Sequence, residues 1–450
     1  IFHSLARRGM YVFKFFKDQQ WRYVIVDDRI PCIDAVPPRY IFAHCSDRNE
    51  LWVSLIEKAY AKLHGCYEAL TNGYIDDALH DLTGYRTEKL KLHGVSGFPH
   101  PDLKNIDFFW DRLKKLVEEE HAIPCCLVSS DQKSNKDREV IIDGESSGVL
   151  SSHAYGILDV FEIPKLNAKG PRATSRLLRV RNPWGKKEWK GKWSDFSPEM
   201  IKNLDIIKRI IDSKMQHSEA DYHEEEFSPD DNDGTFIMCY QDWREIFDTL
   251  FTSFRVPLNW CGLQFCGEWT LRNAGGAPNH YDTTSYRRWA RNPQFIVRLK
   301  ADSSLIVSLE QSDPRLVPGA CFPFRDRIHT MSFMIVQLLP GETLLDEFVS
   351  DRIVKLSLMR QHKEVSARVT LSEGNYMIIP NTKHHGSMGK FVLSVWHDCP
   401  TAGISVRCQN EAFETEKIKS ETEVLDQNME DKTAFYFGRL QEYYHELQGQ

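Results

Sequence analysis

The chain has 450 residues, enough for about three domains of ordinary size. Hydrophobic residues make up 41% and charged residues 27%, so the composition is that of a globular protein and excludes general disorder. The net charge of −7 argues against a nucleic-acid ligand, because proteins that bind nucleic acid present a basic surface to the phosphates.

The longest apolar runs span 122–128 and 333–339. Both are far shorter than the roughly 20 residues that a transmembrane helix needs, so no transmembrane segment is predicted. Eleven cysteines without regular spacing are typical of reduced thiols rather than of a disulfide framework. We therefore expect a protein of the cytosol or of the cytoskeleton.

The N-terminal part combines strand and helix patterns. Residues 10–30 alternate apolar and polar side chains around a polar turn at 17–20, which predicts a β-hairpin. A helix is predicted over about 107–120, after the breaker stretch 97–101. Before it, four apolar residues at helical spacing predict an amphipathic helix: Leu51, Leu55, Ala59 and Leu63.

The rest of the chain is mostly β in pattern. Residues 122–180 predict strands interrupted by one charged loop, and the charge-rich segment 205–232 predicts, in its first half, a solvated insertion. From Trp260 onward, short strands alternate with Pro- and Gly-containing turns, which predicts an antiparallel sandwich. After Cys408 the composition becomes rich in Glu and Lys, and residues 413–447 are predicted to be helical.

Two short motifs carry the chemistry. His153 opens an apolar stretch in the motif His-Ala-Tyr-Gly, and Asn182 closes another in Arg-Asn-Pro-Trp-Gly. A papain-like cysteine protease needs both residue types, because the imidazole takes the thiol proton while the asparagine amide oxygen holds the other ring nitrogen. Either residue alone is uninformative. Together they predict two side chains that lie side by side at one end of a mostly antiparallel sheet.

These motifs lie inside longer stretches that resemble the protease core of the calpain family in order and spacing. The resemblance covers about residues 1–408. After Phe251 it is weaker, and it is to the β-sandwich domain that follows the protease core in calpains. The matching segments are Val26–Pro31, Leu51–Leu70, Asp81–Gly84, His153–Gly156, Arg181–Gly185, Glu188–Asp195, Asp233–Gly234, Gly275–Gly276 and Asn292–Phe295.

The resemblance implies an α+β fold, in which a papain-like protease core is followed by an antiparallel β-sandwich. We expect residues 1–104 to be part of the first protease subdomain and residues 105–255 to be the second, which carries the histidine and the asparagine. Residues 256–408 would form the sandwich and residues 409–450 a charged, helical tail.

The resemblance also implies that Trp184 covers the histidine and asparagine from solvent.

The acidic run before Gly234 does not fit a helix-loop-helix calcium motif. With that glycine at the sixth position, Pro229 and Tyr240 would stand at the first and twelfth, where carboxylates are required. The chain therefore resembles a non-conventional calpain that lacks an EF-hand domain.

In calpains the nucleophilic cysteine lies in a Gly-Asp-Cys-Trp motif at the start of a helix, upstream of the segment that resembles Ile1 onward. The present sequence contains no such motif. Cys66 and the pair Cys125–Cys126 lie in a predicted helix and an apolar run, and we interpret them as buried small hydrophobic residues. We expect the chain to be a fragment of a longer protein and to be inactive by itself.

Calpain cores bind one calcium ion in each half through carboxylates and carbonyls. By resemblance, Glu50 matches an acidic ligand of the first half, and Glu188, Asp195 and Asp233 match ligands of the second. Thr235 stands where the family pattern Asp-Gly-Glu has a glutamate, so one anionic ligand is lost. We expect weak calcium binding, with solvated surface carboxylates as the alternative.

Two functions from different classes are compatible with the sequence. The first is an intracellular calpain-type endopeptidase for extended polypeptide substrates, with His153 as base and acid, Asn182 as orienter and Trp184 as shield. The second is a catalytically silent docking or scaffold module, for example on cytoskeletal structures. Thr235 and the absent nucleophile favour the second. The residue of the parent sequence at the cysteine position of the motif would distinguish them.

Overall fold

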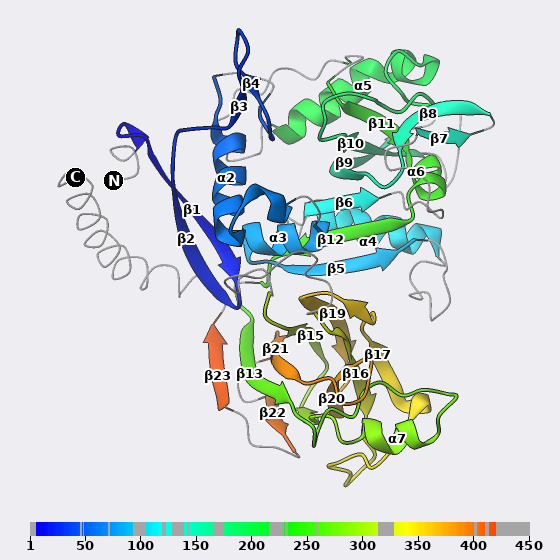
Figure 1. Ribbon diagram of the computed structural model, residues 1–450. Coiled ribbons are helices and arrows are strands. Elements are labelled where there is room, and N and C mark those ends of the chain that lie inside the picture. Colours follow the sequence, from blue (N-terminus) through cyan, green and yellow to red (C-terminus); the bar gives the residue numbers. More distant parts are fainter. Residues whose placement is uncertain are drawn as a thin grey trace, which may run out of the picture. The chain divides into compact units, whose positions relative to one another are not determined.

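The computed structural model describes most of the chain and divides it into two compact units (Figure 1). The first unit comprises residues 1–13, 25–58 and 73–255, and the second comprises 14–24, 59–72 and 256–450. The described residues are 6–45, 47, 49–70, 73–92, 105–118, 123–127, 139–142, 144–164, 174–215, 229, 233–257, 259–313, 328–399, 403–409 and 414–419.

The predicted N-terminal hairpin and helix are both confirmed. The hairpin consists of β1 (Met10–Lys17) and β2 (Gln20–Asp27), and its two turn residues both have positive φ, as a tight hairpin turn requires. The amphipathic helix is α2 (Trp52–His64). Shorter elements of this region are β3 (Cys32–Ile33), β4 (Arg39–Tyr40), the 3-10 helix η1 (Tyr67–Leu70) and α3 (Ile75–Thr83).

A six-stranded antiparallel sheet organises the first unit, in the order β11-β10-β9-β6-β12-β5. Its strands are β5 (Arg86–Lys91), β6 (Ile123–Leu127), β9 (Ala154–Pro164), β10 (Thr174–Arg181), β11 (Thr235–Cys239) and β12 (Thr249–Phe254). The helices α4 (Ile106–Glu118), α5 (Pro198–Met215) and α6 (Tyr240–Ile246) pack against it, and β7 (Glu139–Ile142) and β8 (Glu145–Leu150) form a separate hairpin.

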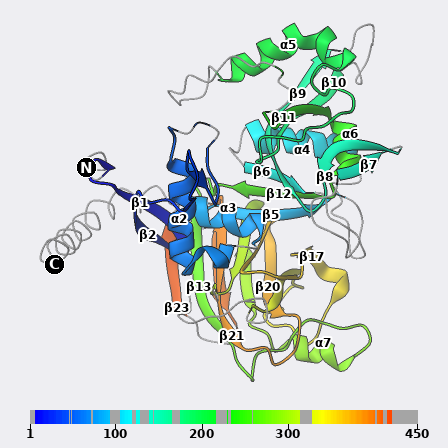
Figure 2. The same cartoon turned by 45° about the horizontal axis from the view of Figure 1, so that its top comes forward.

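The sheet has a hydrophobic core on each face. On one face, side chains of β9, β10 and β11 pack with α4 and α6, where Trp110 and Trp243 are fully buried. On the other face, Phe161 and Leu177 pack against α5. Helix α5 lies along β9 and β10 in both views (Figures 1 and 2). Because both faces are covered, consecutive apolar residues such as Val160 and Phe161 of β9 are both buried, one in each core.

Helix α5 corrects one prediction from the sequence. We expected the first half of segment 205–232 to be a solvated insertion, but residues up to Met215 continue a helix that begins at Pro198. Ile207 and Ile211 are buried in the second core, and their spacing of four places them on one helix face. The charged residues on the other face of the helix concealed this apolar stripe. Residues 216–228 and 230–232 lie outside the described residues.

A β-bulge in β9 decides which way its N-terminal half faces. Arg179 pairs with Asp159, but the next residue, Val180, pairs with Ile157, so Leu158 has no partner on β10 and is 43% exposed. Side chains facing the α4 and α6 core therefore change from even positions, such as Val160, to odd positions, such as Ile157. Residues upstream of the bulge keep this odd phase.

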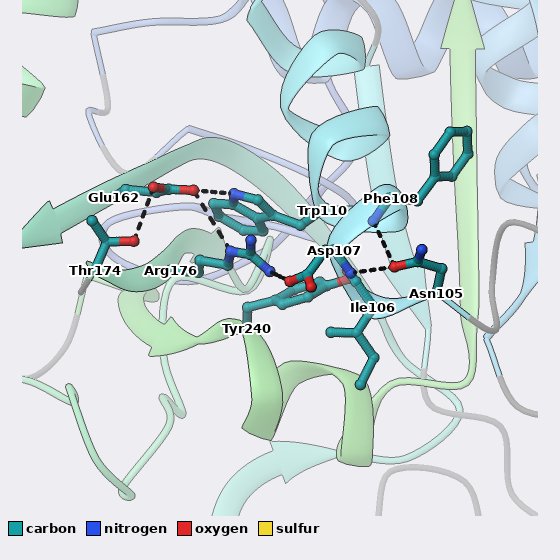
Figure 3. Close-up of polar contacts among 9 residues, drawn as sticks. All are labelled: Asn105, Ile106, Asp107, Phe108, Trp110, Glu162, Thr174, Arg176 and Tyr240. Atoms are coloured by element: carbon teal, nitrogen blue, oxygen red, sulfur yellow. Dashed lines mark hydrogen bonds and ion pairs between the residues drawn. The ribbon is translucent and has the colours of Figure 1, made fainter. Parts of the chain in front are cut away.

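Polar contacts fix the start of α4 on the β9–β10 pair (Figure 3). The buried indole of Trp110 donates from Nε1 to Glu162 Oε1 at 2.6 Å, and Thr174 donates to the other carboxylate oxygen at 3.0 Å. Arg176 Nη1 donates to Asp107 Oδ1 at 2.6 Å. Because leaving a buried indole N–H unpaired costs free energy, the contact with Glu162 favours this position of α4 on the sheet.

The second unit is an antiparallel β-sandwich followed by a further strand. One sheet has the order β19-β15-β21-β13-β23 and the other β17-β16-β20-β14-β22, with β18 paired to β16. The elements are β13 (Cys261–Trp269), α7 (Thr284–Trp289), β14 (Phe295–Leu299), β15 (Ser303–Glu310), β16 (Thr330–Gln337), η5 (Ser350–Arg352), β17 (Ile353–Leu356), β18 (Arg360–Gln361), β19 (Glu364–Leu371), β20 (Gly374–Thr382), β21 (Gly389–His397), β22 (Ile404–Cys408) and β23 (Glu414–Lys419).

The sandwich core follows the alternation of its strands. Phe333 and Ile335 of β16 point between the two sheets, whereas Met334 and Val336 point to the outer face, where Trp289 of α7 helps to cover them. The α+β fold with an antiparallel sandwich is thus confirmed. Among the described residues, no helix is long and apolar enough to span a membrane.

Strand β23 corrects the prediction for the tail. We expected the chain after residue 408 to be helical, but residues 414–419 pair with β13 at the edge of a sandwich sheet. An edge strand offers unpaired backbone N–H and C=O groups, and this attraction does not depend on local helix propensity. The predicted helix over 420–447 lies outside the described residues.

We predict that deletion of Leu158 preserves the fold, because the remaining residues already follow the regular register with β10. The expected loss is less than about 2 kcal/mol in the free energy of unfolding. The control is deletion of Leu178 from β10, which would turn Arg179 and Arg181 into the core. Urea denaturation of both variants checks this, and a failure of the Leu158 deletion to fold would contradict the bulge assignment.

Candidate active site

His153 stands at the entrance to β9. Strand β8 ends at Leu150 and β9 begins at Ala154, and Ser152 in the turn between them has a φ of +56°. A non-glycine residue in this conformation is strained by about 1 kcal/mol or more, and such strain persists only where surrounding contacts impose it. The His153 ring is 8% exposed and meets the edge of the Tyr155 ring at 5.1 Å between centroids.

Asn182 follows the last residue of the neighbouring strand β10. It is in phase with Leu178 and Val180, whose side chains face the α4 and α6 core. The bulge at Leu158 puts Tyr155 on that same face, and His153, two residues earlier, shares this phase. The structure therefore brings the two expected residues together: His153 Nε2 lies 2.9 Å from Asn182 Oδ1.

The orientation of the Asn182 amide follows from its other contacts. Its Nδ2 donates to the backbone carbonyls of Lys186 at 2.6 Å and Lys187 at 3.0 Å. Its Oδ1 also accepts from the Trp184 backbone N–H at 3.0 Å. A flipped amide would oppose donor to donor and acceptor to acceptor, so the oxygen must face His153. His153 Nε2 then carries the proton, and Nδ1 keeps its lone pair.

Trp184 lies over the histidine. Its ring centroid is 4.3 Å from that of His153 with an interplanar angle of 47°, and the indole is 48% exposed. One face of the indole therefore covers the imidazole while the other meets solvent. An apolar cover of this kind lowers the local dielectric and strengthens the hydrogen bond beneath it.

The two cysteines on the strand beside β9 do not offer an activated thiol. Cys125 and Cys126 lie on β6 beside β9, and burial raises the pKa of the Cys125 thiol to about 11 and also raises the pKa of the Cys126 thiol. Both remain protonated at neutral pH. Cys66 is exposed, so our interpretation of it as a buried residue was wrong. None of the described cysteines is hydrogen-bonded to the His153 ring.

The structure separates the expected calcium ligands of the second half. In the described part of the chain, Glu188, Asp195 and Asp233 do not form a group whose ligand atoms all lie within 4.8 Å of one another. Glu188 Oε1 accepts from the Gly234 backbone N–H at 2.6 Å, and Asp233 Oδ1 accepts from the backbone N–H of Thr235. In this structure the Glu188 and Asp233 carboxylates accept from backbone donors.

Two further positions bear on calcium. Arg181 Nη1 donates to Thr235 Oγ1 at 3.2 Å, which brings a positive charge to the position where the family pattern has a glutamate. Glu50, the expected ligand of the first half, is exposed, and its Oε2 accepts from Trp52 Nε1 at 3.1 Å. Neither arrangement adds an oxygen ligand that is held ready for a cation.

Sequence reasoning missed the backbone groups that hold Asn182. The carbonyls of Lys186 and Lys187 accept from its amide, and its own backbone N–H donates to the Gly234 carbonyl at 2.7 Å. No side-chain pattern signals such contacts. The only available signal was Gly185, because a glycine directly after a tryptophan and an Asn-Pro turn suggests a tight loop, and its φ is +63°.

Comparison with known proteins gives a match for two parts of the chain. The family model described as calpain family cysteine protease matches residues 2–253, more than half of the chain, and the model for calpain large subunit, domain III, matches residues 265–396. The chain belongs to the calpain family. Its protease-core segment contains the site described above.

Relatives from plants and animals extend this match over most of the chain. It is 31% identical over 405 residues to the calpain-type cysteine protease DEK1 of Arabidopsis thaliana, which covers 86% of this chain and 16% of that protein. It is 28% identical over 410 residues to calpain-5 of Mus musculus, with 87% and 59% covered. With calpain-B of Drosophila melanogaster the identity is 29% over 417 residues, with 87% and 40% covered. The chain thus spans only part of each relative.

We predict that Asn182→Ala destabilises the protein by about 3 kcal/mol, because it leaves several buried polar groups without partners. It should also release His153 into a mixture of tautomers, visible in the ¹⁵N shifts of the ring nitrogens. The control is Asn203→Ala on α5, whose amide makes one contact at 2.8 Å to the Glu199 carbonyl. That change should cost about 1 kcal/mol and leave the His153 signals unchanged. Equal effects of the two substitutions would contradict the assignment.

Proposed function

We propose that His153 and Asn182 are the general base and the orienter of a calpain-type cysteine endopeptidase. The observation that carries the proposal is the 2.9 Å contact between His153 Nε2 and an Asn182 oxygen whose orientation is fixed by other hydrogen bonds. This arrangement leaves Nδ1 as the basic atom of the ring. Because the chain belongs to a protease family, its proposed substrates are polypeptides.

The proposed reaction follows from this tautomer. A cysteine thiol placed against Nδ1 transfers its proton to the ring, and the resulting thiolate attacks the carbonyl carbon of the scissile peptide bond. The imidazolium then gives this proton to the departing amine, which leaves an acyl-enzyme for hydrolysis. Throughout, Asn182 Oδ1 accepts from Nε2–H and prevents rotation of the ring. Trp184 covers the pair and limits the access of water.

A second candidate function is a catalytically silent docking or scaffold module in the cytoplasm. Its partner would be a cytoskeletal protein. The observation that favours it is Thr235, whose Oγ1 accepts from Arg181 Nη1 at 3.2 Å where the family pattern has an anionic glutamate. Raised thiol pKa values on β6 point the same way, because they leave Cys125 and Cys126 unreactive. The endopeptidase proposal therefore needs a nucleophile that these residues do not supply.

We predict that residues 1–450 hydrolyse no peptide bond by themselves. Joining a calpain-type segment that carries Gly-Asp-Cys-Trp upstream of Ile1 should give turnover of a fluorogenic polypeptide, and His153→Ala should reduce kcat by about a thousandfold. The matched control carries serine in place of that cysteine and should be inactive.

The outcomes separate the candidates. Turnover by residues 1–450 alone that His153→Ala abolishes would reveal an overlooked nucleophile. A fusion that folds and carries the cysteine, yet shows neither turnover nor His153-dependent alkylation of that cysteine, would favour the scaffold.

We further propose that calcium binding by Glu188, Asp195 and Asp233 is weaker than in a relative with glutamate at position 235. Glu188 and Asp233 already accept from backbone donors, which compete with a cation for their oxygens, and Arg181 beside Thr235 opposes a cation. A bound calcium ion would supply positive charge that ties the two loops together. No step of the proposed reaction depends on it.

Thr235→Glu should tighten calcium binding by about tenfold, because it restores an anionic oxygen ligand and gives Arg181 a counter-charge. Isothermal titration calorimetry of the two forms measures the change. Asp233→Ala in the Thr235→Glu background is the control and should remove the gain. Equal affinities of the natural and Thr235→Glu forms would show that these carboxylates are solvated surface charges.

A further inference from the structure

The Glu188 side chain joins two loops that meet behind Asn182. Its Oε1 accepts from the Gly234 backbone N–H at 2.6 Å, and the Gly234 carbonyl accepts from the Asn182 backbone N–H at 2.7 Å. Gly234 therefore transmits the position of the glutamate carboxylate to the backbone of the orienting residue.

The same loop closes on Asn182 from the other side. The carbonyls of Lys186 and Lys187, directly before Glu188 in the chain, accept from Asn182 Nδ2. Lys187 has a φ of +65°, a conformation that a non-glycine residue adopts only where surrounding contacts impose it. The contacts thus form a closed ring that runs from Asn182 through Gly234 and Glu188 and back through the two lysine carbonyls.

Glycines allow the ring to form. A Cβ atom on Gly234, whose φ is +84°, would lie 2.6 Å from Gly185 Cα and 2.7 Å from the Asn182 carbonyl oxygen. A Cβ atom on Gly148, whose φ is +79°, would lie 1.8 Å from the Glu188 carbonyl oxygen. The backbone of Glu188 therefore contacts β8 directly, which fixes the position from which its side chain extends.

We propose that Glu188 is a positioning residue that fixes Asn182, and through it His153, by hydrogen bonds and without a metal ion. The proposal rests on the proposed roles of these two residues and deepens them. Glu188 acts by accepting a hydrogen bond through its carboxylate oxygen. It does not act by binding a cation through its negative charge. An acceptor of the same shape should therefore replace it.

Glu188→Gln and Glu188→Ala separate the two roles. Glutamine keeps an oxygen that can accept from the Gly234 N–H, whereas alanine removes it. In the presence of EDTA, the natural protein and the glutamine form should both show slow hydrogen exchange of the Asn182 backbone amide and a single His153 tautomer in ¹⁵N spectra. The alanine form should exchange that amide about tenfold faster and show mixed tautomers. Glu245→Ala, an exposed glutamate on α6, is the matched control and should change neither signal.

Three results would overturn the proposal. The glutamine form could behave like the alanine form, the alanine form could keep both natural signals, or calcium added to the natural protein could change its His153 tautomer or Asn182 exchange. If the alanine form does not fold, the comparison of the glutamine form with the natural protein in EDTA and in calcium still decides. These readouts need no nucleophile, so a failure of peptidase activity in the fusion would leave them unaffected.

Discussion

The site depends on how one buried amide satisfies its hydrogen bonds. Asn182 is fully buried, so both Nδ2 protons and the Oδ1 oxygen must find partners inside the protein. Two loop carbonyls take the protons, which leaves the oxygen for Trp184 N–H and His153 Nε2. The tautomer of the histidine is a consequence of this assignment. Its basic nitrogen is thus determined by backbone groups that never touch it.

The sheet provides the second constraint, because the pair must lie on one face. Strands β9 and β10 are antiparallel, so the residue before one and the residue after the other meet at the same end. Two cores on opposite faces fix which side chains of each strand point to which face. The bulge at Leu158 turns the residues before it, so that His153 lies on the same face as Asn182. The contact of Glu162 with Trp110 holds α4 on the same two strands.

Two of the expected calcium ligands act as hydrogen-bond acceptors for the backbone in this structure. Glu188 and Asp233 accept from backbone N–H groups, and these contacts connect the loop after β10 to the loop before β11. A calcium ion and a backbone N–H compete for the same carboxylate oxygens, since both are attracted to negative charge. Under the proposed ligand assignment, threonine in place of glutamate at position 235 would shift that competition toward the backbone. Coupling between the loops can therefore persist where the ion binds weakly.

The sequence by itself determined the family, the α+β class with a sandwich, the N-terminal hairpin, α2, α4 and the residue types of the site. These follow from local periodicity and from motifs whose chemistry resides in side chains. Only the tertiary structure decided the bulge at Leu158, the helix up to Met215, the strand over 414–419 and the carbonyls that hold Asn182. A strict alternation read back from Val160 puts His153 on the wrong face, and no local pattern reveals the extra residue. The physical reason is that phase, edge pairing and backbone acceptors depend on neighbours distant in the chain.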